Sequence, residues 1–206
     1  MAGFDRWSLY ETQPSIVMGF HGCDRSVGEG ILSGKTDHLN HSTNDYDWLG
    51  GGIYFWESNP ERAFDFASER SQGGKSSRGA IKDPFVLGAV IDLGRCLNLV
   101  DSAALQQVKD AYDILLASRD KDQLPTNGEA LMARRLDCAV IETLHEFRKE
   151  QGYEPFNSVR GVFWEGDDLY TGAGFKSKNH IQICVRDQSC IKGYFRPIEH
   201  PPALKS

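Results

Sequence analysis

The feature that most constrains this chain is a run of three glycines that leads directly into an apolar, aromatic segment. Its residues are Leu49, Gly50, Gly51, Gly52, Ile53, Tyr54, Phe55 and Trp56. Glycine has no Cβ, so its backbone adopts conformations and allows close contacts that other residues exclude. A glycine run before apolar residues predicts a turn followed by a strand. The same freedom suits a backbone that approaches a ligand closely.

A second apolar segment lies upstream and ends in a histidine and a glycine. Residues 16–22 predict a first strand, with His21 and Gly22 at its end. Asp24 is a suitable N-cap for a short helix over 25–32. The polar stretch that separates this helix from the glycine run is long enough to predict a functional loop.

Length and charge limit the class of protein. The 206 residues are 40% hydrophobic, which predicts one globular domain over residues 1–206, with a lead-in at 1–15 and a tail at 197–206. The net charge of -6 argues against broad, non-specific binding of nucleic acid, which depends on clustered positive charge. It leaves room for a local basic groove at an active site.

Cysteine usage and the lack of long apolar runs predict a cytoplasmic protein. The five cysteines are scattered, form no CxxC pair, and show no zinc-ligand spacing with histidine. We therefore expect free thiols in a reducing compartment and no metal site. No secretory signal and no stretch of membrane-spanning length is visible, so no membrane association is expected.

The rest of the chain predicts an α+β fold with a mixed or antiparallel sheet. Ala63, Phe64, Phe66 and Ala67 are expected on the buried side of a helix that opens at 58–60. His145 is expected on the solvated side of a later helix. Further elements are predicted as a loop at 71–83, a strand at 85–93, helices at 101–116 and 129–150, a loop-rich stretch at 151–179, and two strands at 180–186 and 191–196.

Taken together, four segments resemble the catalytic domain of poly(ADP-ribose) polymerases and their bacterial relatives. The order of the segments agrees with that family, whereas the helical stretch 101–150 has no counterpart in it. The resemblance implies an ADP-ribosyltransferase fold with split mixed or antiparallel sheets and flanking helices. The segments are Phe20-His21-Gly22, Gly50-Gly51-Gly52-Ile53-Tyr54-Phe55, residues 86–94, and a C-terminal hairpin of residues 182–187 with Ile191, Tyr194 and Phe195.

The resemblance implies NAD as substrate and assigns roles to particular residues. His21 would bond the adenosine-side ribose, and the backbone of Gly22 would hold the nicotinamide amide. Tyr54 would stack on the nicotinamide ring. Gly52 and Tyr46 would complete the NAD-binding set. A strand-end histidine bonded to backbone is the alternative reading of His21.

The third catalytic position departs from the family. Many members have glutamate where this chain has Gln182. A carboxylate accepts a proton and stabilises positive charge, whereas a carboxamide only forms hydrogen bonds. By the family's logic this favours transfer of a single ADP-ribose, or reduced activity. Glu165, on the preceding glycine-rich loop, is the alternative acid, and His180 is a further candidate, although a structural role is preferred for both.

The sequence therefore leads to the hypothesis of a mono-ADP-ribosyltransferase that modifies a protein or nucleic acid. Arg160, Trp164 and Tyr170 are candidates to line the substrate groove, or else packing residues under a long loop. The compact chain suggests a bacterial toxin or anti-phage effector, for which analogy implies a neutralising antitoxin protein. NAD glycohydrolysis, RNA 2′-phosphotransfer and a degenerate NAD or ADP-ribose binding module remain alternatives.

Overall fold

A computed structural model describes residues 16–73, 81–118, 123–128 and 133–198. Within these residues, seven strands form one mixed sheet in the order β4-β5-β6-β2-β1-β3-β7. The strands are β1 (Ile16–Asp24), β2 (Ile53–Glu57), β3 (Pro84–Asp92), β4 (Cys96–Asn98), β5 (Ser158–Phe163), β6 (His180–Val185) and β7 (Ile191–Phe195). The helices are α1 (Arg25–Leu32), α2 (Pro60–Gln72), α3 (Ser102–Ser118) and α4 (Arg135–Glu150).

The sheet is nearly divided in two between β1 and β2. These strands pair only at Gly19 with Glu57 and at Phe20 with Trp56, whereas β1 and β3 pair along nine residues. One continuous sheet is therefore present where split sheets were expected, but its two halves are joined by a narrow contact. The mixed α+β character of the fold is confirmed.

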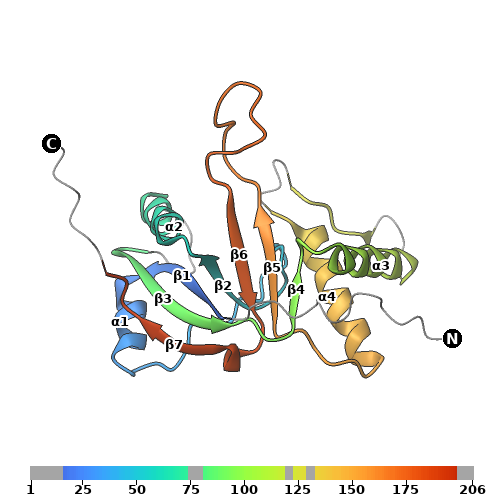
Figure 1. The fold of residues 1–206 in the computed structure, drawn as a ribbon, viewed down its shortest axis with the longest axis horizontal. Coiled ribbons are helices and arrows are strands. Elements are labelled where there is room, and N and C mark those ends of the chain that lie inside the picture. The colour runs from blue at the N-terminus through green and yellow to red at the C-terminus, as the bar shows by residue number, and fades with distance from the viewer. Residues whose placement is uncertain (1–15, 74–80, 119–122, 129–132, 199–206) are drawn as a thin grey trace.

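The two faces of the sheet are covered by different helices (Figure 1). Ile31 of α1 packs with Phe55, Leu87 and Ile91 in a core on one face. On the other face, α2 covers the β1 and β3 side, and α3 and α4 cover the β4 and β5 side. This second face is left open between the two sets of helices.

Local signals place the starts of α1 and α2 correctly. The side chain of Asp24 accepts a hydrogen bond from the Ser26 amide, and Asn59 caps α2 from immediately before Pro60. Short polar side chains in these positions satisfy the amides that a helix start leaves free. The expected buried side of α2 was wrong at one residue, because Phe64 is 49% exposed.

Two sequence predictions about strands are corrected. The stretch 151–179, expected to be loop-rich, contains β5. The expected C-terminal hairpin does not form, because β6 pairs with β2 and β5 whereas β7 pairs with β3 at the far edge. A short 3-10 helix, Gln188–Cys190, carries the chain between them. The lead-in, most of the tail and most of the 71–83 loop lie outside the described residues. The helix expected over 129–150 starts later than predicted, because α4 begins at Arg135 and the preceding Arg134 forms a β-bridge with Asn127.

His145 is not on a solvated face, as the sequence suggested. Its Nε2 is buried with no hydrogen-bond partner among the described residues, and its ring packs edge-on against Phe156. Burial, aided by the nearby charge of Arg186, lowers the pKa of His145 from 6.5 to about 4. The imidazole is therefore neutral in the folded protein at neutral pH.

This burial predicts a loss of stability in acid that depends on His145. Between pH 6.5 and 4 the unfolded chain binds a proton at His145 that the folded chain does not, so stability falls as pH falls through this window. Urea unfolding should show wild type losing about 2 kcal/mol more than His145→Gln between pH 7 and 4. The exposed His41→Gln serves as control. Parallel profiles for wild type and His145→Gln would contradict the prediction.

Candidate functional site

A cavity of about 500 Å³ lies on the open face of the sheet. Four candidates from the sequence line it together: Tyr46, Tyr54, Glu165 and Gln182. Further aromatic walls come from Trp48, Trp56, Phe66 and Phe163, and cationic groups from Arg62, Arg70 and Arg134. Flat aromatic surfaces with arginines suit a ligand that carries both rings and phosphates.

Pairing between strands explains why Gln182 meets the aromatic residues. Gln182 lies opposite Trp56 of β2 and Gly161 of β5, and residues directly opposite each other project to the same face. Tyr54 lies two residues from Trp56 and so shares that face. The side chains of three strands that are distant in sequence thus converge on one cavity.

The hydroxyl group of Tyr54 is anchored to the glycine run. It donates to the carbonyl of Gly50 at 2.7 Å and accepts from the amide of Leu49 at 3.1 Å. Burial raises the pKa of Tyr54 well above its usual value, so the phenol stays neutral. The ring is held in one orientation at the cavity wall.

The carboxamide of Gln182 is oriented by an indole. Trp48 Nε1 donates to Gln182 Oε1 at 2.7 Å. An indole nitrogen only donates, so the amide oxygen must face Trp48 and the amide nitrogen points away from it. Gln182 therefore offers hydrogen-bond donors to a ligand, and its oxygen is already used.

Glu165 is neutralised by a buried arginine. Arg62 Nη2 lies 3.0 Å from both carboxylate oxygens, and the Arg62 side chain is buried. His180 lies behind this pair, with Nδ1 donating to the carbonyl of Lys178 at 2.7 Å and 4.0 Å from Glu165. Burial lowers the pKa of His180, which keeps it neutral. A carboxylate in this setting is a structural counter-ion to Arg62.

The side chain of His21 does not line the cavity. It follows Phe20 on β1, so it points to the opposite face, where its ring packs edge-on against Phe55. Its Nδ1 donates to the backbone oxygen of Tyr54 at 2.8 Å. Burial lowers the pKa of His21. The structure thus gives His21 a contact that supports the backbone of Tyr54.

The two candidate glycines lie where elements approach closely. A Cβ on Gly22 would lie 2.1 Å from the carbonyl oxygen of Ala63 in α2. A Cβ on Gly52 would lie 2.3 Å from Cys184 Sγ. Both positions require glycine for packing, whatever the ligand.

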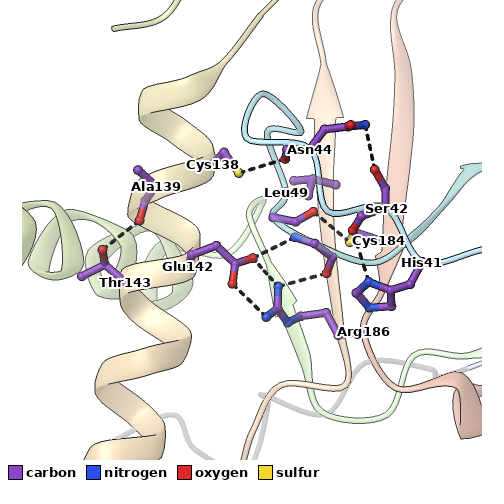
Figure 2. A network of polar contacts seen from close by, with 12 residues as sticks. His41, Ser42, Asn44, Leu49, Cys138, Ala139, Glu142, Thr143, Cys184 and Arg186 are labelled. Carbon is purple, nitrogen blue, oxygen red and sulfur yellow. Dashed lines mark hydrogen bonds and ion pairs between the residues drawn. The ribbon is translucent and has the colours of Figure 1, made fainter. Parts of the chain in front are cut away.

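An ion pair between Glu142 of α4 and Arg186 binds the backbone of the glycine run. Glu142 accepts from Arg186 Nη1 at 2.7 Å and from the amide of Gly51 at 2.7 Å (Figure 2). Arg186 Nη1 also donates to the carbonyl of Gly51 at 3.1 Å. The carbonyl group of Gly50, whose φ angle is +79°, accepts the hydrogen bond from the Tyr54 hydroxyl. The helix α4 therefore fixes the loop to which Tyr54 is anchored.

The three proposed acceptor-groove residues are placed differently. Arg160 lies on the other face of the sheet, where it forms an ion pair with Glu57 at 2.6 Å. Trp164 and Tyr170 lie on the loop 164–179, which projects beyond the sheet between β5 and β6 (Figure 1). Both are at least 60% exposed. Trp164 and Tyr170 are thus exposed to solvent, whereas Arg160 is paired on the face of the sheet away from the cavity.

Sequence reasoning missed Arg62 and Asp47 as cavity residues and took Trp48 only as a loop anchor. Arg62 is buried against Glu165, which lies 103 residues further along the chain, and no local motif predicts such a pair. Asp47 lies in the polar loop that was expected to be functional, which is the one signal that could have found it. Among the described residues, no His, Cys, Asp and Glu group is arranged to hold a metal ion.

Comparisons of the chain with protein-family models, with curated proteins and with solved structures found no match. No helix in the described ranges is long and apolar enough to cross a membrane.

Proposed function

We propose that this protein is a mono-ADP-ribosyltransferase that cleaves NAD and transfers ADP-ribose to a macromolecular acceptor. The observation that carries the proposal is the meeting of Tyr54 and Gln182 at one aromatic, arginine-lined cavity. The mixed sheet, whose two halves are joined only by the short pairing of β1 and β2, is compatible with the ADP-ribosyltransferase fold that the resemblance implies.

The cavity offers what the reaction needs. Breaking the bond between nicotinamide and ribose passes through an oxocarbenium-like state, as glycoside cleavage does. The ring of Tyr54 would stack on nicotinamide, and the amide nitrogen of Gln182 would donate to the adjoining ribose. Arg70 and Arg134 would lie near the phosphates. His21 would act through its bond to the backbone of Tyr54.

The acceptor would dock at the loop 164–179. This loop exposes Trp164, Leu169, Tyr170 and Phe175, each at least 60% exposed. Its base reaches the cavity at Glu165. Exposed aromatic side chains at the edge of a site favour a macromolecular partner over water.

The proposal is tested by nicotinamide release from labelled NAD. Purified protein is assayed alone and then with cell lysate, RNA or DNA, and the labelled product is identified. Release that needs an acceptor would support a transferase, and release without one would support the NAD glycohydrolase. NAD binding without release would leave a binding module.

Gln182→Leu is expected to lower the kcat/KM of nicotinamide release roughly tenfold. The variant keeps the size of the side chain but removes the donors to the ribose and the bond from Trp48. The exposed Gln106→Leu on α3 is the matched control. Unchanged release in Gln182→Leu would remove Gln182 from the site.

A further inference from the structure

The cavity is lined by three acidic side chains, and two of them are paired with a cationic side chain. Glu165 is bound by Arg62, with both oxygens at 3.0 Å from Nη2. Glu69 lies 2.7 Å from Lys178 Nζ. Asp47 forms no ion pair within the described ranges. It is therefore the one cavity acid in this part of the chain whose charge no ion pair balances.

Asp47 also has a free oxygen atom. Both of its side-chain donors, Ser42 Oγ at 2.5 Å and Asn44 Nδ2 at 3.4 Å, bind Oδ2. No donor among the described residues binds Oδ1. The backbone carbonyl of Asp47 accepts from Gly50 at 2.8 Å, which ties the residue to the loop that holds Tyr54. One carboxylate oxygen is thus fixed by the protein and the other is left for a ligand.

The carboxylate of Asp47 lies close to Trp48 and Tyr54, two of the residues that form the cavity. It precedes Trp48, whose indole orients Gln182. Its charge contributes to the raised pKa of Tyr54. The groups that face it are Ser42, Asn44, Tyr54, Cys138 and Cys184, with the carboxylate of Asp45 on the same loop. Burial and Asp45 raise the pKa of Asp47, which makes it a better base than a surface aspartate.

We propose that Asp47 is the catalytic carboxylate of this site, in the place of the glutamate that Gln182 replaces. This inference rests on the proposed function. The bond between the nicotinamide nitrogen and ribose C1′ breaks, and its electron pair leaves with neutral nicotinamide. The carboxylate stabilises the positive charge that develops on the ribose. A hydroxyl group of the acceptor then bonds to C1′, and Asp47 Oδ1 takes the hydroxyl proton and releases it to solvent.

The test compares Asp47→Asn with Asp45→Asn in the nicotinamide-release assay with acceptor. The asparagine at 47 can still accept from Ser42, so the loop is preserved, and circular dichroism confirms folding. We expect kcat to fall roughly 100-fold or more while KM for NAD changes less than about threefold. Asp45 is exposed and paired with Arg135, and its charge is the smallest of the causes that act on the pKa of Asp47, so Asp45→Asn should lower kcat by no more than about twofold.

Two further readouts separate catalysis from structure. Wild-type kcat should fall at acid pH as Asp47 is protonated, and Asp47→Asn should lack this decline. Formate should restore part of the activity of Asp47→Ala. Retained kcat in Asp47→Asn would overturn the inference while leaving the transferase intact. No nicotinamide release by wild type would instead overturn the proposed function and, with it, this role for Asp47.

Discussion

Replacing Tyr54 by alanine is expected to reduce nicotinamide release from NAD roughly 10- to 100-fold. Alanine removes the ring on which nicotinamide would stack, and stacking of this kind contributes about 1–3 kcal/mol per ring. It also removes the hydroxyl group that binds Leu49 and Gly50, so the loop that carries Asp47 loses an anchor. The measurement is steady-state nicotinamide release, at a temperature where the variant is folded.

Tyr54→Phe is the matched control for this prediction. It keeps the ring and removes only the two hydroxyl bonds, so KM should stay within a few-fold of wild type if stacking dominates. A loss in Tyr54→Phe as large as in Tyr54→Ala would show that the hydroxyl anchor matters more than the ring. Full activity in Tyr54→Ala would exclude this cavity as the NAD site.

Replacing Gly22 by alanine is expected to destabilise the protein by about 3 kcal/mol. The added methyl group would lie 2.1 Å from the carbonyl oxygen of Ala63 and 3.0 Å from its carbonyl carbon. Both are backbone atoms of α2, so relief requires the whole helix to move away from β1, and overpacking of this kind is costly. Urea unfolding monitored by circular dichroism measures the loss.

Gly193→Ala provides the control for the effect of removing a glycine from a strand. Gly193 lies in β7, and no atom lies within 4 Å of the position that a Cβ would take there. Its replacement should therefore not destabilise the protein, and should stabilise it by about 0.5–1 kcal/mol because alanine lowers the entropy of the unfolded chain. Equal stability of Gly22→Ala and wild type, together with weakened NAD binding, would assign Gly22 to ligand contact instead of helix packing.

Much of the secondary structure is predictable because its signals are local. The cap at Asp24, the Asn59 and Pro60 start of α2, and the apolar run of β3 each depend on residues within a few positions. The short strands β4 and β5 were not predicted. Their backbone is extended because neighbouring strands supply hydrogen bonds, and the sequence of 151–179 contains many turn-forming residues.

The candidate site is only partly predictable. Tyr54 and Gln182 were found from motifs, and the structure brings them together with Tyr46 and Glu165. His21 was expected beside Tyr54, but the two-residue period of a strand turns its ring to the opposite face. Glu165 is paired with Arg62, a partner that no local pattern indicates.

The order of the helices and main strands, the free thiols and the residue types available for chemistry follow from the sequence alone. The tertiary structure decided which strand lies beside which, and therefore that β6 stands next to β2 and not β7. Tertiary packing also brings a cation to Glu165 and, within the described residues, none to Asp47. Local propensity acts over a few residues, whereas strand pairing and ion pairing join residues far apart in the chain, where sequence patterns carry little information.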